Sequence, residues 1–275
     1  MKNILKIMLM MITIFTIAGS AVYAAEIPVS DQDQLITSND WTEISNLQDE
    51  MKKEEPDATI DYDKALKVYV DCNLIKLQTA DTKKLTSALE SANYVWVIPF
   101  KMEKTYGMFT VAKGLPLREE AKSVLTKAEQ EEVKNHAGKW MITEIAEHTV
   151  EPYYDILLEK REALSDCTRV VLVGSQPGMR QPVALGMDDE TARIWISLGY
   201  QYPVMEKIPE TQNVESGVYS FDSVAEISDT YIEDSEVSTG VGVQSRSSMK
   251  YVAGIGIIVI GSILIFSVLK KKKLE

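Results

Sequence analysis

The sequence predicts an α+β fold with a mixed or mostly antiparallel sheet and about three helices, followed by one C-terminal transmembrane helix. Segments with strand periodicity interleave with helical segments without a regular βαβ repeat. The 275-residue chain is 45% hydrophobic and 25% charged, which is typical of a folded domain. Near its C-terminus a long apolar run ends in lysines.

The predicted strands are apolar or alternating runs. Leu66, Val68 and Val70 alternate with more polar neighbours, and residues 94–98 are nearly continuously apolar. Pro99 predicts that the second strand ends there or lies at an edge of the sheet. Further strand patterns cover residues 108–113, 140–146, 168–173, 183–185 and 194–196. Three of these strands carry Trp96, Trp140 and Trp195, which we expect in the core rather than on a sugar-stacking surface.

Three helices follow from capping signals and helical spacing. Asp81 can cap a helix that places Leu85 and Leu89 on one face. Thr126 and Glu129 have the spacing of a capping box, and Gly138 marks the end of that helix. Pro152 is suited to the first turn of a helix that runs through Leu164.

Composition divides the chain into six parts. Residues 25–60 are polar and acidic, which predicts a loosely ordered lead-in to the domain at 61–202. Residues 203–249 are rich in Ser, Thr, Gly and acidic residues, which predicts a flexible acidic stalk. The alternative is that residues 218–232 add a strand to the domain. The remaining parts are a signal peptide at 1–24, a transmembrane helix at 250–269 and a tail at 270–275.

The two ends of the chain predict its position relative to a membrane. Lys2 and Lys6 precede an apolar run, and Val22-Tyr23-Ala24 fits a signal-peptide cleavage site. Residues 251–269 are uncharged and long enough to cross a bilayer as a helix. The lysines that stop this span on the cytoplasmic side are Lys270, Lys271, Lys272 and Lys273. The domain is therefore expected outside the cytoplasm; the alternatives are an uncleaved N-terminal anchor and, for the second run, a buried core helix.

The exported part is strongly acidic. Without Lys2, Lys6 and the last six residues, which carry a net +3, the formal charge falls from −12 to −17. This charge repels phosphate backbones, so nucleic acid is excluded as a partner, and it mainly serves solubility. The expected partners are the lipid bilayer, through the C-terminal helix, and a protein or cell-wall ligand.

Cys72 and Cys167 are the two cysteines of the chain. Because both lie in the exported region, where oxidation is permitted, we expect them to form a structural disulfide. The alternatives are two free buried thiols or a catalytic thiol, although neither cysteine lies in a CxxC motif or beside a histidine.

The segment Glu236-Val237-Ser238-Thr239-Gly240 is followed by a polar spacer, the apolar span and the lysines. This arrangement resembles the cell-wall sorting signal of Gram-positive bacterial surface proteins. The resemblance covers about the last 40 residues and implies cleavage between Thr239 and Gly240 with covalent attachment to the cell wall. Glu236 and Val237 depart from the Leu and Pro of that signal. The alternative localisation is the cell membrane, with the C-terminal helix retained as a single-pass anchor.

Few residues predict chemistry. The acidic run Asp188-Asp189-Glu190 offers oxygen ligands for Ca²⁺, although such runs also decorate exposed turns. His148 lies near Glu144, Glu147 and Glu151, and these residue types can build a carboxylate–histidine pair or a Zn²⁺ site. Neither His148 nor His136 belongs to an HExxH pattern, and a surface position also explains both. Residues 174–178 match neither a phosphate loop nor a nucleophile elbow, so they predict a turn after a strand.

These features favour a membrane-anchored binding or interaction module at the cell surface, without a cofactor. Its six-residue cytoplasmic tail is too short for a signalling domain. One alternative is an ectoenzyme, a metal-assisted hydrolase that uses Asp188, Asp189 or His148. Another alternative is an accessory subunit of a membrane complex.

Overall fold

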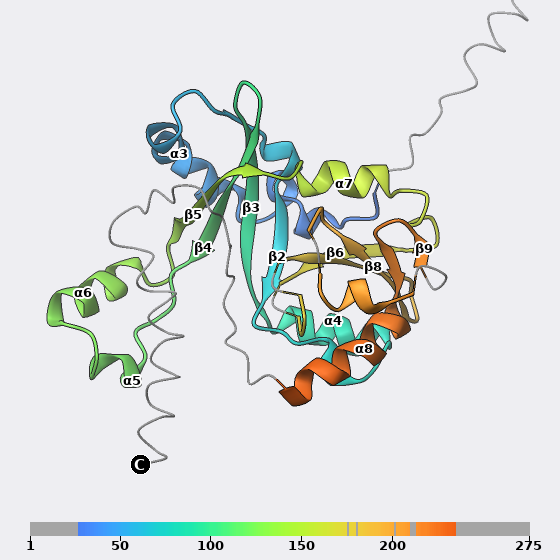
Figure 1. Ribbon diagram of the computed structural model, residues 1–275. Helices are drawn as coiled ribbons and strands as arrows, with labels where there is room; N and C mark the ends of the chain where they lie inside the picture. The colour runs from blue at the N-terminus through green and yellow to red at the C-terminus, as the bar shows by residue number, and fades with distance from the viewer. Residues whose placement is uncertain (1–26, 175, 180, 201, 210–212, 235–275) are drawn as a thin grey trace, which may run out of the picture.

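The computed structural model describes residues 27–174, 176–179, 181–200, 202–209 and 213–234 (Figure 1). Their strands form one sheet with the order β5-β4-β3-β2-β6-β7-β8-β10-β9, and β1 pairs with β3. The strands are β1 (Thr59–Ile60), β2 (Leu66–Val70), β3 (Asn93–Lys101), β4 (Tyr106–Lys113), β5 (Trp140–Thr149), β6 (Arg169–Val173), β7 (Val183–Met187), β8 (Ala192–Ser197), β9 (Asn213–Glu215) and β10 (Val218–Ser220). The α-helices are α2 (Trp41–Ile44), α3 (Gln48–Glu54), α4 (Thr82–Glu90), α5 (Glu119–Lys122), α6 (Lys127–His136), α7 (Tyr153–Glu159) and α8 (Phe221–Asp234).

The predicted α+β class with a mostly antiparallel sheet is confirmed. Among the paired strands of the described residues, β2 and β6 run parallel and the other pairs are antiparallel. The fold has more helices than the three expected. No helix within the described part of the chain is both long and apolar enough to span a bilayer. The predicted span at 250–269 and the signal peptide at 1–24 lie outside the described residues.

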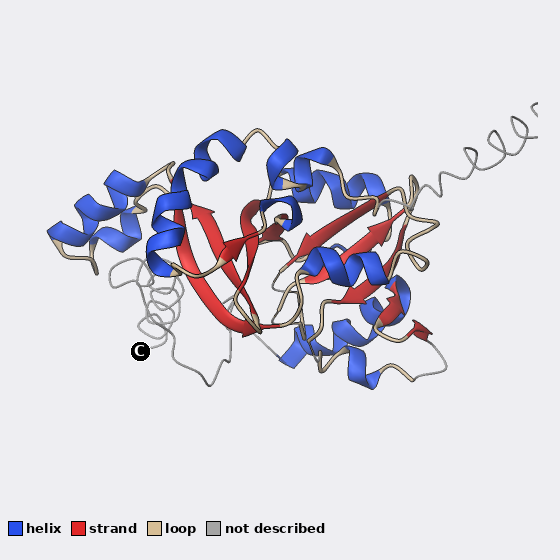
Figure 2. Cartoon of the chain, turned by 90° about the horizontal axis from the view of Figure 1, so that it is seen from above, coloured by secondary structure: helices blue, strands red, loops and turns tan. Residues whose placement is uncertain are grey.

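Helices and short turns cover both faces of the sheet (Figure 2). On one face, α7 packs over the centre through Tyr153 and Leu157. On the other face, α4 and α8 cover β6, β7 and β8. The N-terminal segment covers β3, β4 and β5 on that same face. Figure 1 shows α5 and α6 standing out beyond β4 and β5.

The capping signals in the sequence are confirmed. The carboxylate of Asp81 accepts the backbone N–H of Lys84 at 3.0 Å at the start of α4. Thr126 and Glu129 form the reciprocal capping box of α6. The three tryptophans are in the core, with Trp96 and Trp195 fully buried and Trp140 7% exposed.

The expectation for Pro99 is wrong, because β3 continues through it to Lys101 with a neighbour on each side. The carbonyl of Pro99 accepts the N–H of Asp61, so this edge of the residue faces the gap between β1 and β2. The 3-10 helix η4 (Tyr62–Lys64) interrupts the neighbouring strand there. Pro99 has no N–H to donate, and no neighbouring strand lies at this point to accept a hydrogen bond from it.

The predicted lead-in at residues 25–60 is packed from residue 27 onward rather than loosely ordered. It forms short helices and β1, and it supplies three side chains with 0% exposure, Leu35, Ile44 and Met51. Its few apolar residues are widely spaced along the chain, and each one enters the core from a different short helix. This spacing produces no periodicity from which sequence analysis could infer order.

The first part of the predicted stalk at residues 203–249 belongs to the fold instead. Val204, Met205 and Ile208 are buried, and β9, β10 and α8 belong to the fold. The alternative of an added strand at 218–232 holds for Val218–Ser220, after which the chain forms α8. Residues 235–249 lie outside the described residues.

The N-terminal segment joins the two halves of the sheet where β2 and β6 meet. These strands pair at Val68 with Leu172 and at Tyr69 with Val173. Nearer their N-terminal ends, the N–H of Val170 donates to the carbonyl of Pro28 at 2.7 Å, and the N–H of Leu35 donates to the carbonyl of Ala65 at 3.1 Å. Residues 28–35 therefore bond to both halves at this seam.

Asp33, in the 3-10 helix η1 (Asp31–Asp33), is the buried charge of this segment. Its side chain is 2% exposed and accepts hydrogen bonds from Ser30 Oγ at 2.6 Å and Tyr69 Oη at 2.7 Å. Arg169 Nη2 lies 3.1 Å from one carboxylate oxygen, and Lys67 Nζ lies 3.7 Å from the other. The carboxylate thus pairs with one cation from β6 and one from β2.

Lys67 also lies among aromatic rings, with Nζ 4.5 Å from the ring centre of Tyr94 and 5.3 Å from that of Trp96. Asp40 fixes both rings, because it accepts Tyr94 Oη at 2.8 Å and Trp96 Nε1 at 3.0 Å. Burial lowers the pKa of Lys67, while Asp33 and Asp40 oppose this shift. We call Asp33, Asp40, Lys67, Tyr69, Tyr94, Trp96 and Arg169 the charged seam.

We expect Asp33→Asn to destabilise the protein by about 3 kcal/mol, because it leaves the partly buried Arg169 and Lys67 without this counter-charge. Urea denaturation followed by tryptophan fluorescence measures this change. Asp31→Asn is the matched control, since Asp31 is exposed in the same turn, and it should change the free energy of unfolding by less than about 0.5 kcal/mol. Equal effects of the two substitutions would show that the charged seam does not hold the N-terminal segment.

Candidate binding site

The predicted disulfide between Cys72 and Cys167 is wrong, and both thiols are free. Cys72 follows the end of β2 and Cys167 precedes the start of β6, so in parallel strands they are separated by at least the length of β6, about 16 Å. They also pack on opposite faces of the sheet. A disulfide requires Cα atoms within about 7 Å. Burial raises the pKa of each thiol to about 11, which argues against a catalytic thiolate.

The acidic run at 188–190 forms the turn between β7 and β8. Asp188 accepts the backbone N–H groups of Glu190 at 2.8 Å and Thr191 at 2.6 Å, and it pairs with Arg193. The hydrogen bonds from Thr191 and Glu190 lower the pKa of Asp188. Asp189 accepts the hydroxyl of Thr168 at 2.9 Å. These contacts assign Asp188 and Asp189 to the turn and to its attachment beside β6.

The described residues contain no group of three or more His, Cys, Asp or Glu placed to hold a metal ion. His148 lies in β5, and His136 is the last residue of α6. The predicted sorting residues Thr239 and Gly240 and the stop-transfer lysines at 270–273 lie outside the described residues.

Glu144 is a largely buried carboxyl on β5. It lies near the tyrosines Tyr153 and Tyr200, whose hydroxyls are 3.4 Å apart. Burial raises the pKa of Glu144, and a hydrogen bond from Thr110 opposes this shift. The neighbours of the Glu144 carboxyl are therefore a hydroxyl from β4 and two tyrosines.

The raised pKa of Glu144 predicts a pH dependence of stability. A carboxyl whose pKa is higher in the folded state loses stability as the pH rises from its unfolded value of 4.5 through its folded value. Glu144→Gln should therefore raise Tm at pH 7, by about 2–4 °C for each kcal/mol relieved, and change it little at pH 4.

Thermal unfolding of Glu144→Gln at both pH values tests this expectation. Glu103→Gln, at an exposed position in the turn between β3 and β4, is the matched control and should leave both Tm values unchanged. A lower Tm for Glu144→Gln at pH 7 would contradict the expectation, because it would mean that the charged form stabilises the fold.

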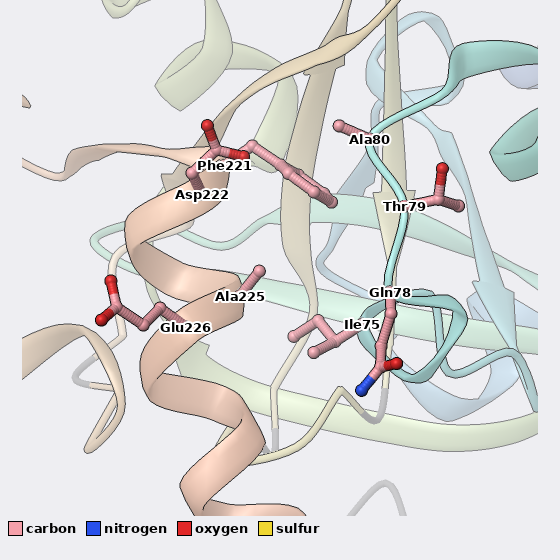
Figure 3. A pocket seen from close by; sticks show the side chains of 8 residues that line it. All are labelled: Ile75, Gln78, Thr79, Ala80, Phe221, Asp222, Ala225 and Glu226. Atoms are coloured by element: carbon pink, nitrogen blue, oxygen red, sulfur yellow. The ribbon is translucent and has the colours of Figure 1, made fainter.

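A cleft of about 270 Å³ separates α8 from the segment 75–80 (Figure 3). Ile75, Gln78, Thr79 and Ala80 line one side, and Phe221, Asp222, Ala225 and Glu226 line the other. In Figure 3, Phe221 and Ala225 point from the helix toward Ile75. Asp222 stands at the rim, and Glu226 projects from the outer side of α8. The lining of the cleft thus combines apolar side chains with polar and acidic ones in equal number.

The wall at 75–80 is held by side-chain and backbone contacts. The 3-10 helix η5 (Ile75–Leu77) ends at Gln78, which has a left-handed backbone with φ of 49° and turns the chain into an extended segment. Ala80 then accepts the N–H of Ala192 at 2.7 Å, which ties the segment to the start of β8. Before η5, buried Gln176 accepts the N–H of Leu74 at 2.9 Å. The turn at 174–178 therefore supports this wall.

The opposite wall is the first two turns of α8. Ser220 caps the helix by accepting the N–H of Ser223 at 3.2 Å. The ring of Phe221 stacks on Trp195 with centres 5.7 Å apart and an interplanar angle of 13°, and Val224 is fully buried. Both walls are therefore anchored independently of any occupant.

This cleft could not be predicted from the sequence pattern, because residues 221–226 fall within the predicted stalk. A signal was present. The apolar or small residues Phe221, Val224, Ala225 and Ser228 have helical spacing, and Ser220 precedes them as a capping residue. The wall at 75–80 carries no comparable pattern, so only the three-dimensional arrangement brings the two segments together.

Comparison with known proteins provides no further assignment: no family model matches the chain, and no similar curated protein or solved structure is found. The function must therefore be argued from the cleft, the charges and the ends of the sequence.

Proposed function

We propose that this chain is a binding module displayed outside the cytoplasm, held at the membrane by its C-terminal helix, and that the cleft between α8 and residues 75–80 is its ligand site. The observation that carries the binding role is the cleft itself, whose two walls are anchored separately and carry both apolar and polar side chains. A preformed concave site with a few polar groups at its rim is typical of ligand binding. The signal-like start and the lysine-flanked apolar run support the display.

The length of chain between the domain and the predicted span limits the position of the cleft. Helix α8 ends at Asp234 and the predicted span begins at 250, which leaves residues 235–249. Even a fully extended chain of this length reaches no more than about 50 Å. The domain would therefore remain near the membrane surface, and α8, which lines the cleft, is the element that leads to the anchor.

Binding is favoured over the metal-assisted hydrolase. The proposed ligands Asp188 and Asp189 make contacts within their turn, as described above. The cleft is lined by two carboxylates, but both are exposed, and no histidine, cysteine or lysine lines it among the described residues. A general acid or base with a tuned pKa would require a more enclosed group.

The display is tested with protease added to intact cells that express the full chain with an epitope tag after the last residue. We expect loss of the full-length band and survival of a short tagged fragment, because the cytoplasmic tail and span are protected. A cytoplasmic marker protein that stays intact is the control. Full protection of the chain would contradict display. Recovery of the chain only after cell-wall digestion would indicate cleavage at Thr239 and attachment to the wall.

The ligand site is tested by filling it. A panel of small ring-containing compounds of positive, neutral and negative charge is screened by ligand-observed NMR against the full chain in a non-ionic detergent. We expect at least one binder, and we expect Ala225→Trp to abolish its signal because the indole occupies the cleft. Ala128→Trp, on an exposed position of α6, is the matched control and should retain binding. Absence of any binder, or binding unaffected by Ala225→Trp, would refute the cleft as the site.

A further inference from the structure

We infer that the arm formed by residues 114–139 is a second membrane contact, which rests on an anionic bilayer surface and fixes the orientation of the domain above it. The arm contains α5 and α6 and joins β4 to β5. This inference rests on the proposed membrane anchor and is independent of the cleft. It follows from the exposed apolar side chains of the arm, from its charge and from the side of the domain on which α8 ends.

The base of the arm is fixed to the sheet. The N–H of Gly114 donates to the carbonyl of Lys139 at 2.9 Å, and the N–H of Gly138 donates to the carbonyl of Gly114 at 2.8 Å. The backbone of His136 comes so close that a Cβ added to Gly114 would lie 2.1 Å from its carbonyl oxygen. Figure 1 shows the arm projecting from this base beyond the sheet. The ends of β4 and β5 therefore set the direction in which it projects.

Hydrogen bonds fix the turn between α5 and α6. The side-chain amide of Gln130 donates to the carbonyl of Lys122 at 3.0 Å and to that of Leu125 at 2.9 Å. The capping box of Thr126 and Glu129 fixes the start of α6. These polar contacts hold the shape of the arm, so its apolar side chains are left for another contact.

These apolar side chains face solvent. No described side chain between residues 113 and 132 is buried. Leu115, before α5, is 42% exposed, and Val124, after α5, is 52% exposed. The two residues flank one short helix at a projecting part of the domain. Insertion at the boundary between lipid headgroups and acyl chains would remove both side chains from water.

Basic residues accompany the exposed apolar ones. The chain as a whole has a formal charge of −12, but basic residues outnumber acidic ones between positions 113 and 127. Leucine together with lysine and arginine is typical of segments that lie at a membrane interface. Their cationic groups pair with lipid phosphates while their hydrocarbon stems stay beside the acyl chains. The basic residues are Lys113, Arg118, Lys122 and Lys127, and the acidic ones are Glu119 and Glu120.

The proposed anchor brings this surface to the bilayer. Helix α8 ends at Asp234, and only residues 235–249 separate it from the predicted span. In Figure 1, α5 and the C-terminal end of α8 both lie at the lower side of the domain, whereas α7 lies at the upper side. A bilayer reached from the end of α8 therefore faces the arm. Because the anchor already holds the domain near the surface, a weak contact is sufficient to select one orientation.

Lipid quenching of a fluorophore tests the contact. Val124→Cys in the full chain is labelled with an environment-sensitive fluorophore and reconstituted into vesicles of phosphatidylcholine and phosphatidylglycerol that contain a spin-labelled lipid. Leu158→Cys is the matched control, since Leu158 is a 37% exposed apolar residue of α7. We expect quenching at position 124 to be at least about 2-fold stronger than at position 158. The unmodified chain is the labelling blank, because burial raises the pKa of Cys72 and Cys167 to about 11.

Variants of the basic residues test the role of charge. Arg118→Gln combined with Lys127→Gln should lower the quenching at position 124 about 2-fold, because two attractions to anionic headgroups are lost. Lys53→Gln combined with Lys104→Gln removes the same charge from exposed positions on α3 and in the turn between β3 and β4, and should leave the quenching unchanged. Equal effects of the two pairs would contradict a specific contact of the arm. Unchanged melting temperatures of the variants exclude unfolding as the cause.

The possible failures are distinguishable. Equal quenching at positions 124 and 158, in a chain that resists alkaline extraction from the vesicles, would refute the arm contact and leave the anchor in place. Extraction of the chain by alkali would refute the proposed anchor, and the inference would fail with it. Blue-shifted emission at position 124 without lipid quenching would overturn the inference in favour of contact with a second copy of the chain.

Discussion

The two halves of the sheet meet at one short parallel seam, and the buried carboxylate of Asp33 closes that seam. The halves are otherwise separate antiparallel arrays, one built from β3, β4 and β5 and the other from β7, β8 and β10. Arg169 brings a positive charge to the seam from β6, and Lys67 brings one from β2. Removing one partner of such a buried ion pair leaves the other charge uncompensated. The resulting loss of folding free energy is larger than the net stabilisation that the intact pair contributes. The acidic N-terminal segment is therefore an integral part of the folded domain.

This arrangement also explains why the cleft has a fixed shape. The strands that carry its walls belong to the second half of the sheet, where β8 supports both α8 and the segment 75–80. That segment follows β2, so it reaches β8 only because the seam places β2 beside β6. Gln176 then bonds the chain before η5 to the loop after β6. The shape of the cleft therefore depends on the pairing of β2 with β6, which Asp33 stabilises.

Residues that sequence analysis marked for chemistry are used for structure instead. Asp188, a proposed metal ligand, holds a turn. Cys167 lies against Gly186, where an added Cβ would come within 2.8 Å of its sulfur, so this thiol fills a space in the core. Such residue types are versatile, and their number of neighbours in the fold cannot be read from spacing along the chain. The groups that line the cleft are ordinary by type and become a site only through their position.

Local signals in the sequence were sufficient for the elements whose energetics are local. The alternation at residues 66–70, the cap at Asp81 and the capping box at Thr126 predicted strands and helices correctly, because hydrogen bonds and burial within one segment decide them. The pairing order of the strands, the burial of residues 27–60 and the separation of Cys72 from Cys167 were decided only by tertiary structure. In each case the deciding contact joins residues far apart in the chain. Asp33 meets Arg169 and residues 75–80 meet α8 only after the sheet has formed, so no pattern within a single segment reveals them.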